Sequence, residues 1–472
     1  MNVRSIYNRM KSRVDDEWVD RAKDALSPVY RTAIYNAYQP VQNRIQFRRR
    51  LQNVPQYDFD DRDVLFLVVD CLRNDHLSRS GYSRETTPFL DSVGTYHPNC
   101  VSAAPWTYPS VPSILTGLYP HNHGAIFEAD RRNNAMNTPL ASVRDDVHTL
   151  SEILAKDGYE TFLTAGIVTA ELSVRGRFRR ANAHYDGVHD APANEMVDHL
   201  LDWWDSTDGN RFGYVHFADL HADLRRPEVQ PFGAVPDIPD LEHWDYTHTT
   251  EPQEEFDRYR RERTRLYDTN LHFLDTQIRR LFKALAERGD LDDTLIVVLG
   301  DHGEEFWERV ELQRAHFDDP RGIYGTGHGH ALIPEVLFVP LIIVGGDDQP
   351  TDDWVSTTDV APTVLTELGL PDEHVSAYDG VPLQRPETGR AVLSEEVAYG
   401  WDQQAVVRDN HLLIHSPHED ETVVLDLKTD DLVDDDDLEA ELKGYLAEEK
   451  RSGNAATLDS QTKNQLADLG YI

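Results

Sequence analysis

Side chains that can bind a metal ion follow three apolar runs of strand length in this 472-residue chain. They are Asp70 after Val64–Val69, Asp301 and His302 after Leu295–Leu299 and one glycine, and Asp219 and His221 after Phe212–Phe217. In an open α/β sheet, ligands bind at the carboxyl ends of the strands. Oxygen and nitrogen donors at three such ends predict a divalent metal site. For any single carboxylate, a helix cap or a loop hydrogen bond is the alternative.

A candidate nucleophile lies in the segment Trp106–Gly117, which is typical of a loop entering a short helix. Thr107 stands before the first turn, where backbone N–H groups and the helix dipole favour an anion. A free threonine hydroxyl is a poor nucleophile, but coordination to a metal lowers its pKa. On this segment alone, an ordinary N-cap threonine is the more frequent arrangement.

The elements that must position these residues alternate along the chain. Apolar runs of strand length occur at Val64–Val69, Tyr159–Leu163, Phe212–Phe217, Leu295–Leu299 and Leu341–Val344, and helical patterns include His148–Lys156 and Glu254–Arg288. Continuous apolar runs are typical of parallel strands that are buried on both faces. The alternation predicts an α/β fold with a doubly wound, mostly parallel sheet. Residues 218–255, rich in Pro, Asp and His, are expected to form a long functional loop.

Shifts in composition suggest three parts. Residues 1–60 form a predicted N-terminal helical extension, because Arg21–Arg50 has the pattern of one or two amphipathic helices. We expect this extension to pack on the main domain, with contact to a membrane surface or a partner as the alternative. Residues 61–385 form the predicted catalytic domain. Short β patterns between 391 and 427 predict that residues 386–472 form a small C-terminal subdomain with an antiparallel sheet and a helix.

The charge excludes some classes of protein. The formal net charge is −38, and the acidic residues are spread along the whole chain. A nucleic-acid binder of the basic-patch kind needs Lys and Arg to meet phosphates, so no nucleic-acid partner is expected. Docking on an anionic membrane through a broad basic face is disfavoured for the same reason. With 8 Lys against 38 Arg, the composition predicts a halophilic protein whose self-repulsion is screened by salt.

The cellular compartment is predicted from what the composition lacks. Cys71 and Cys100 are the only cysteines, which is too few for a disulfide framework. No apolar run reaches the ~18–20 residues of a membrane span, and Met1–Asp20 has no apolar stretch like that of a secretory signal. The expectation is a soluble cytoplasmic protein. The oligomeric state is not predicted.

Several motifs between residue 70 and the end of the chain resemble those of one known protein family. The segments Asp70-Cys71-Leu72-Arg73-Asn74-Asp75-His76-Leu77, Thr107-x-Pro109-Ser110, Leu115-Thr116-Gly117-Leu118-Tyr119-Pro120-His121-x-His123-Gly124 and Gly300-Asp301-His302-Gly303-Glu304 resemble the sulfatase family of the alkaline phosphatase superfamily. Val339–Ile343, Asp359–Thr363 and the final Leu469-Gly470-Tyr471 are similar to later landmarks of that family. The resemblance extends from about residue 62 to the end of the chain and implies an alkaline-phosphatase-like fold.

The resemblance also implies roles for individual residues. Asp70, Asp301 and His302 would bind one or two divalent ions (Ca, Mg, Mn or Zn), and Thr107 would be a nucleophile that touches the same ion. Arg73, His221 and His328 would contact the substrate anion. His221 and His330 are the candidates to protonate the leaving group, and His328 or His330 could instead complete a second metal site.

Three departures from the family pattern restrict the expected reaction. Sulfatases proper carry a Cys or Ser nucleophile that is converted to formylglycine, with Arg four residues later, whereas this chain has Thr107 and Val111. The second Asp of the usual Asp-Asp pair is Cys71, which we expect to be a small buried residue rather than a ligand. The family's Gly-Lys-x-His segment corresponds to Gly166–Thr169, so its Lys is replaced by Ile167. These features resemble the threonine-bearing phosphodiesterase and phosphoglycerol-transferase branches.

The sequence therefore predicts a metal-dependent hydrolase or transferase of phosphate or sulfate esters that forms a covalent ester on Thr107. Small-molecule, glycan and lipid-headgroup esters all remain open as substrates. The alternatives are a genuine sulfatase with an unmodified threonine, a non-catalytic binding protein on the same fold, and a structural surface-assembly protein.

Overall fold

A single large sheet organises the molecule. The computed structural model describes residues 43–127, 131–132, 140–184, 191–239, 241–242, 254–447 and 450–453. Eight strands form the main sheet in the order β11-β2-β10-β7-β1-β6-β4-β5. Their bounds are β1 Asp63–Val69, β2 Thr95–Val101, β4 Glu160–Ala165, β5 Arg180–Ala183, β6 Arg211–Phe217, β7 Thr294–Gly300, β10 Phe338–Val344 and β11 Val355–Ser356. The predicted doubly wound, mostly parallel sheet is confirmed, and each predicted strand lies within a residue or a few of its observed bounds.

One strand runs against the others. β7, β1, β6, β4 and β5 are mutually parallel, whereas β10 pairs antiparallel with both β7 and β2. Two reversals restore the direction, so β2 points the same way as the parallel strands. As a result, the end of β2 and the beginning of β10 lie at the same edge of the sheet as the carboxyl ends of β1, β6 and β7.

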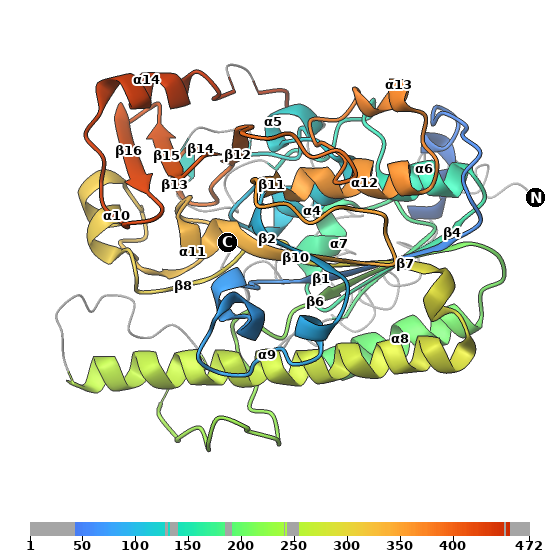
Figure 1. Cartoon of the computed structure of the whole chain (residues 1–472), viewed down its shortest axis with the longest axis horizontal. Coiled ribbons are helices and arrows are strands. Elements are labelled where there is room, and N and C mark those ends of the chain that lie inside the picture. Colours follow the sequence, from blue (N-terminus) through green and yellow to red (C-terminus); the bar gives the residue numbers. More distant parts are fainter. Residues whose placement is uncertain are drawn as a thin grey trace, which may run out of the picture.

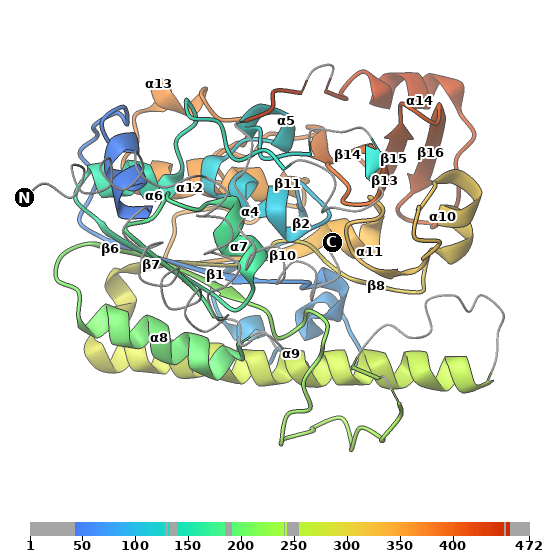
Figure 2. The ribbon, with the colours of Figure 1, turned by 180° about the vertical axis from the view of Figure 1, so that it is seen from behind.

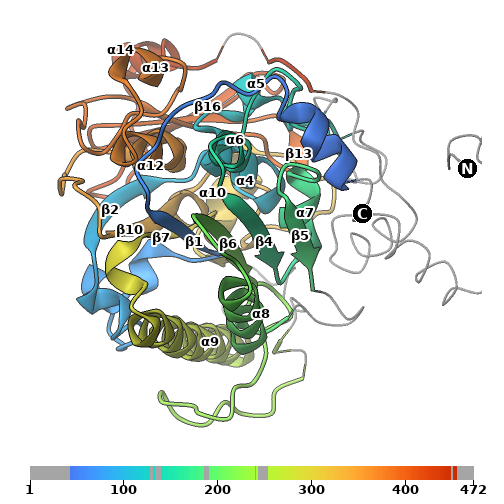
Figure 3. The same cartoon turned by 90° about the vertical axis from the view of Figure 1, so that its right-hand side faces the viewer.

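Helices cover both faces of the sheet. Side chains 65, 67 and 69 of β1 pack in the core cluster that includes α8 (Ala193–Asp205) and α9 (Glu254–Arg288). Side chains 64, 66 and 68 pack in the cluster on the other face with α4 (Thr107–Thr116), α6 (Leu150–Lys156), α7 (Val168–Ser173) and α12 (Val360–Glu367). Figure 3 shows the sheet between these two layers. Burial on both faces explains why β1 is an uninterrupted apolar run.

A separate antiparallel sheet lies in the C-terminal region, beside one end of the main sheet (Figure 1). Its order is β12-β14-β15-β16, and α14 packs beside it. The bounds are β12 Val392–Glu395, β14 Gln404–Arg408, β15 His411–Ser416, β16 Glu421–Asp426 and α14 Asp436–Lys443. The predicted small C-terminal sheet is thus confirmed. The division of the chain at residues 60 and 385 stays a prediction.

The other elements are short. They are β3 Arg131–Arg132, β8 Glu305–Phe306, β9 Thr326–Gly327, β13 Gly400–Trp401, α5 Pro120–His123, α10 Val310–His316, α11 Pro334–Leu337, α13 Asp372–Val375, and the 3₁₀ turns η1 Asn74–His76, η2 Ser78–Ser80, η3 Leu90–Ser92, η4 Leu291–Asp293 and η5 Thr357–Asp359. Figure 2, seen from behind, shows α7 on the same face of the main sheet as α4 and α12.

The predicted N-terminal extension is only partly described. Residues 43–50 are helical, and Phe47 is buried. Most of Arg21–Arg50 lies outside the described residues, so its amphipathic helices and its contact with a membrane or a partner stay predictions. In the part of the chain that the structure describes, no helix combines the length and the apolar character that crossing a membrane requires.

Candidate active site

The carboxyl ends of β1 and β7 place Asp70 and Asp301 side by side. The pairing of β1 with β6 and of β7 with β1 continues for one residue after the strands end. The Asp70 amide donates to the Phe217 carbonyl at 2.9 Å, and the Asp301 amide donates to the Val69 carbonyl at 3.4 Å. Both side chains are fully buried. The two carboxylates that the apolar runs predicted to lie together therefore do so.

The direction of β2 brings the predicted nucleophile to the same place. The chain leaves β2 at the carboxyl edge and enters α4, of which Thr107 is the first residue. The Ser110 hydroxyl, one turn later, donates to the Asp301 carbonyl at 2.6 Å and so ties α4 to the end of β7. The helix therefore begins beside the carboxylates of Asp70 and Asp301, with its positive N-terminus toward them.

Thr107 contacts two of the predicted ligands. Its Oγ1 lies 3.2 Å from Asp70 Oδ2 and 3.3 Å from His302 Nε2, and all three side chains are fully buried. No side-chain cap bond is recorded at the start of α4. The Thr107 hydroxyl therefore does not cap the helix.

His302 presents an unprotonated nitrogen to this cluster. Its Nδ1 lies 2.9 Å from the Gly303 carbonyl, which can only accept, so Nδ1 carries the proton and Nε2 the lone pair. Burial, together with the nearby His328, lowers the pKa of His302 to about 3. A neutral imidazole with a free Nε2 lone pair is the form that ligates a metal.

His216 is a site residue that the sequence analysis missed. It lies inside β6, and its Nε2 is 3.3 Å from Asp70 Oδ2 and 3.7 Å from Asp301 Oδ2. Although burial opposes ionisation, the hydrogen bond from His216 holds the pKa of Asp70 well below its usual range. Its signal in the sequence is that it is the one imidazole within the apolar run Phe212–Phe217, whereas the predicted site residues all follow the end of a strand.

The donor set fits a divalent cation. One oxygen from each of Asp70 and Asp301 and one nitrogen from His302 all lie within 4.8 Å of one another. Asp301 Oδ2 has no hydrogen-bond partner among the described residues. Burial and the neighbouring Asp70 carboxylate raise the pKa of Asp301 well above its usual range. A bound cation would supply the missing partner for this oxygen and would favour the ionised form of both carboxylates.

A second group of donors adjoins the first. Cys71, His302 and His328 also place ligand atoms within 4.8 Å of one another. The Nδ1 atom of His328 lies 3.5 Å from Cys71 Sγ and 3.2 Å from Glu304 Oε2. His221 joins from the loop after β6, with its ring 5.3 Å from that of His328. Cys71 is fully buried, as expected, but it lies among ligand atoms rather than among apolar side chains alone.

Two predicted residues lie elsewhere. His330 Nε2 contacts Glu305 Oε2 at 2.9 Å, and Glu305 in turn accepts from the Gln313 amide at 2.6 Å. Asp219 accepts a hydrogen bond from the amide of Ala193, the first residue of α8, at 3.0 Å. The helix-cap alternative therefore describes Asp219. The role of His330 as an acid stays a prediction, and no contact between His330 and Thr107 is found among the described residues.

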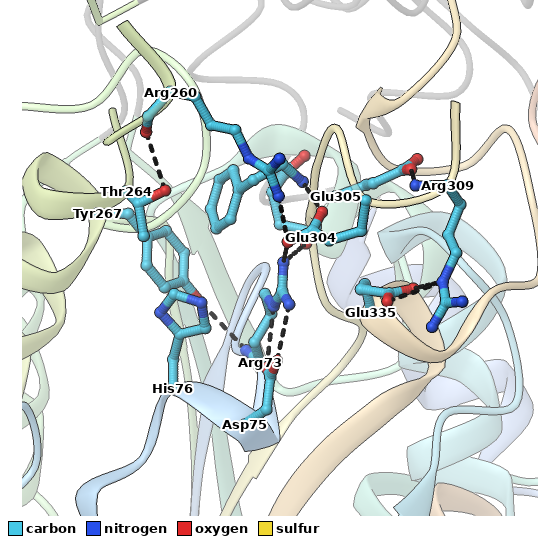
Figure 4. A network of polar contacts seen from close by, with 12 residues as sticks. Arg73, Asp75, His76, Arg260, Thr264, Tyr267, Glu304, Glu305, Arg309 and Glu335 are labelled. Atoms are coloured by element: carbon cyan, nitrogen blue, oxygen red, sulfur yellow. Dashed lines mark hydrogen bonds and ion pairs between the residues drawn. The ribbon is translucent and has the colours of Figure 1, made fainter. Parts of the chain in front are cut away.

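The guanidinium of Arg73 is engaged by the protein. It forms ion pairs with Asp75 at 2.7 Å and Glu308 at 2.9 Å, and it donates to the Glu304 carbonyl at 3.0 Å. Figure 4 shows Arg73 between Asp75 and the segment that carries Glu304 and Glu305. Through these contacts, Arg73 links the loop after β1 to the segment after β7. Its predicted contact with a substrate anion would require some of them to break.

The chain has an α/β fold of the alkaline-phosphatase-like architecture, and the carboxyl edge of its sheet carries a cluster of side chains that could hold a metal ion. The chain belongs to the sulfatase family, whose profile, described as Sulfatase, matches residues 62–370. It is therefore an ester hydrolase or a sulfotransferase-like enzyme.

Individual relatives are distant. The chain is 24% identical over 339 residues to the low-salt glycan biosynthesis sulfotransferase Agl7 of Haloferax volcanii, which covers 71% of this chain and 67% of that protein. It is 22% identical over 420 residues to the arylsulfatase of Clostridium perfringens, covering 75% and 83%. The structure of the phosphonate monoester hydrolase of Agrobacterium radiobacter is similar with a TM-score of 0.59 at 17% identity, covering 81% and 94%. At that identity the structural likeness shows the fold alone.

Proposed function

We propose that this protein is a metal-dependent hydrolase or transferase of phosphate or sulfate esters that works through a covalent ester on Thr107. The observation that carries the proposal is the placement of the Thr107 hydroxyl, which contacts Asp70 at 3.2 Å and His302 at 3.3 Å at the N-terminus of α4. The non-catalytic alternative is disfavoured, because these groups are kept together in one buried cluster.

Asp70, Asp301 and His302 would hold the cation. Once bound, the ion would neutralise charge on the non-bridging oxygens of the substrate and make the threonine hydroxyl more acidic. His216 would keep Asp70 ionised and oriented through its hydrogen bond, as partners behind metal ligands commonly do.

The reaction would proceed in two displacements. Thr107 Oγ1 forms a bond to phosphorus or sulfur while the bond from that atom to the leaving-group oxygen breaks. The threonine proton passes toward Asp70 Oδ2, the acceptor of its hydrogen bond, and the leaving oxygen takes a proton from an imidazole. His221 and His328 are the imidazoles beside the cluster. Water or an acceptor alcohol then attacks the same central atom and gives its proton to the imidazole, while the Thr107 oxygen departs and regains its proton from Asp70.

A sulfate-transferring alternative has one specific observation behind it. The Haloferax relative is named as a glycan biosynthesis sulfotransferase, and it matches 71% of this chain. On this alternative, the ester on Thr107 would be a sulfate and the acceptor a glycan hydroxyl. We favour a phosphate ester on Thr107 over a sulfate ester. A formylglycine hydrate can release its sulfate by collapsing to an aldehyde, whereas a threonine ester cannot and needs a second attack at the central atom.

Trapping the ester tests the proposal. The purified protein would be incubated with nitrophenyl phosphate, phosphodiester, phosphonate and sulfate esters, in high salt with Mg, Mn, Ca or Zn, and then quenched in acid. Mass spectrometry of the Thr107 peptide is expected to show the added phosphoryl, phosphonyl or sulfuryl group. Thr116, the buried last residue of α4, is the internal control and should stay unmodified. Turnover without any adduct on Thr107, under conditions that accumulate intermediates, would contradict the mechanism.

A further inference from the structure

We propose that a cavity lined by arginines, at the β5 end of the main sheet, binds a small soluble molecule that carries a phosphate or sulfate group. The cavity has a volume of about 500 Å³, which falls within the roughly 300–1,000 Å³ of small-molecule sites. Asp145 is the one acidic residue among the described lining residues, whereas four of them are arginines, namely Arg49, Arg50, Arg175 and Arg177.

The cavity is separate from the site at Thr107. One wall is the helix of residues 43–50 with the turn after it, and another is the end of α7 with the connection to β5. Figure 3 shows this helix beside α6 and α7, at the end of the sheet that β4 and β5 form. β5 is the last strand in the sheet order, whereas Asp70 and Asp301 follow the central strands β1 and β7. Among the described residues, none that lines the cavity forms a hydrogen bond or an ion pair with Asp70, Thr107 or Asp301.

Two guanidinium groups of the cavity share one buried carboxylate. Arg177 Nη1 lies 2.8 Å from Glu152 Oε2, and Arg50 Nε lies 4.0 Å from Glu152 Oε1. The same carboxylate also accepts a hydrogen bond from the Thr149 amide at 2.9 Å, as part of the cap of α6. Burial lowers the pKa of Arg177, and the nearby Arg50 lowers it further, although Glu152 opposes both effects. The inner part of the cavity therefore carries positive charge that Glu152 balances only in part.

The other two arginines leave the cavity with an excess of positive charge. Arg175 pairs with Glu171 at 2.7 Å, whereas Arg49 is exposed and forms no ion pair with a described residue. Asp145 lies 2.8 Å from Arg50, so within the described part of the chain four guanidinium groups meet three carboxylates. The chain as a whole has a net charge of −38. A positive cavity on such a chain is a place where an anion is attracted rather than repelled.

Several donors are available to a bound anion. The Asp145 side chain is 68% exposed, and an ion pair as exposed as the one with Arg50 contributes little to stability. A ligand anion can therefore replace Asp145 on Arg50. Gln46 and Asn53 also line the cavity, and neither side chain forms a hydrogen bond with another described residue. Together with Arg49, these groups offer the guanidinium and amide N–H donors that match phosphate and sulfate oxygens.

The lining also limits the rest of the ligand. Leu172 is the one apolar side chain among the described lining residues, and none of them is aromatic. A nucleobase would have no ring to stack on, and an acyl chain would bury little apolar surface. A phosphate or sulfate group on a small polar body, such as a sugar, is the ligand class that suits this cavity.

Calorimetric titration of the full chain tests the proposal. The probes are the phosphonate and sulfonate analogues of glucose 6-phosphate and glucose 6-sulfate, which have no ester bond to hydrolyse, and glucose itself as the uncharged probe. At one fixed KCl concentration we expect saturable binding of at least one charged analogue and no binding of glucose. Arg49→Gln and Arg50→Gln should each raise the Kd by about 10-fold or more, because each variant loses a charge-assisted hydrogen bond.

Arg48 provides the matched control. It is exposed on the same helix and does not line the cavity, so Arg48→Gln removes the same charge and should leave the Kd unchanged. Absence of saturable binding of both charged analogues would overturn the site. Equal weakening by Arg48→Gln and Arg49→Gln, or binding that Arg49→Gln leaves intact, would overturn it as well.

Two further measurements fix the source of the anion and the independence of the site. Phosphatidylglycerol vesicles should not compete with the phosphonate analogue, and competition would overturn the assignment to a soluble ligand in favour of a lipid headgroup. Arg49→Gln should leave kcat on a nitrophenyl ester unchanged, whereas a loss of turnover would place Arg49 at the catalytic edge and overturn a separate site. Because binding is measured without turnover, failure of Thr107 as the nucleophile would leave this proposal standing.

Discussion

The hydroxyl of Tyr267 on α9 donates a hydrogen bond of 2.7 Å to the carbonyl of Cys71 and accepts one of 3.1 Å from the amide of Arg73. Tyr267 is fully buried, with its ring 5.0 Å from that of Phe306. One side chain of the covering helix thus fixes the backbone directly after Asp70, the proposed metal ligand. The orientation of the site therefore depends on a residue that lies 196 positions from Cys71 in the sequence.

Removing this hydroxyl is expected to lower kcat by more than the loss of folding stability alone would explain. Tyr267→Phe leaves a buried carbonyl and a buried amide without partners, at a cost of about 1–3 kcal/mol in the free energy of unfolding. We expect kcat to fall by roughly 10-fold with KM little changed, because misplacement of the reacting groups lowers the rate. Kinetics on a confirmed substrate and urea denaturation measure the two effects.

Tyr159 provides the matched control for this prediction. Its hydroxyl lies within hydrogen-bond distance of the carbonyls of Asp60 and Arg62, at 3.1 and 2.9 Å, before the amino end of β1. Tyr159→Phe should destabilise the protein by a similar amount and leave kcat unchanged. Equal kinetic losses in the two variants would mean that Tyr267 has no positioning role.

Replacement of Thr107 should remove turnover while the protein stays folded. Thr107→Ala is expected to lower kcat by about 10³-fold or more, because only metal and binding effects remain without the nucleophile. Thr107→Ser should keep part of the activity, since serine offers the same hydroxyl. Steady-state kinetics and calorimetric metal titration provide the readouts. An alanine variant that retains more than about a tenth of the wild-type rate would exclude Thr107 as the nucleophile.

The enzyme is expected to prefer phosphate over sulfate esters. Ile167, at the place of the family's lysine, is fully buried in the core, so no positive charge is offered there to hold a sulfate. We predict that kcat/KM for a phosphodiester or phosphomonoester exceeds that for the matching sulfate by at least ~10-fold, or about 1.4 kcal/mol. The comparison needs one aryl leaving group, one metal and one salt concentration. A preference for sulfate would instead favour the sulfotransferase-like alternative.

Stability should rise with salt. The net charge of −38 makes the folded chain repel itself, and screening weakens that repulsion. The Tm is expected to increase between about 0.1 M and 3 M KCl, a range in which the Debye length falls to about 3 Å and below. Sucrose, a neutral osmolyte that does not screen charge, is the control and should not reproduce the charge-dependent part of the increase. A Tm that stays level or falls with KCl would count against a halophilic protein.

The free energy of unfolding should depend on pH through Asp275 on α9. Burial raises the pKa of Asp275 to about 6, although it accepts hydrogen bonds from the Leu90 and Phe89 amides. Below about pH 4, Asp275 is protonated in both the folded and the unfolded chain. As the pH rises from about 4 to 6, the unfolded chain loses this proton first, so stability falls by up to about 3 kcal/mol.

The variant Asp275→Asn removes this titration. Denaturation at fixed KCl should show that the difference in unfolding free energy between wild type and variant changes across that window and levels off above it. Asp205 gives a control of opposite sign, since the hydrogen bond from Arg288 lowers its pKa and its small contribution is lost as the pH falls. If the difference between the wild type and the Asp275→Asn variant were constant from pH 4 to 7, the assignment would be refuted.

Local features of the sequence determined much of the fold. The run Val64–Val69 is buried on both faces of the sheet, and a segment with that requirement has to be apolar throughout. The long amphipathic pattern Glu254–Arg288 is one helix with those same bounds, because a 3.6-residue period repeats without interruption. Asp70 and Asp301 were identified because the first polar residue after a buried strand is visible in the sequence itself.

Tertiary structure alone decided how the remaining residues meet. The antiparallel direction of β10 brings the segment containing His328 and His330 to the catalytic edge, and the pairing of His330 with Glu305 then keeps that imidazole in a separate cluster. His216 became a site residue only because β6 lies next to β1 in the sheet. Strand order and direction depend on the packing of both faces at once, summed over segments hundreds of residues apart, so they leave no local signal in the sequence.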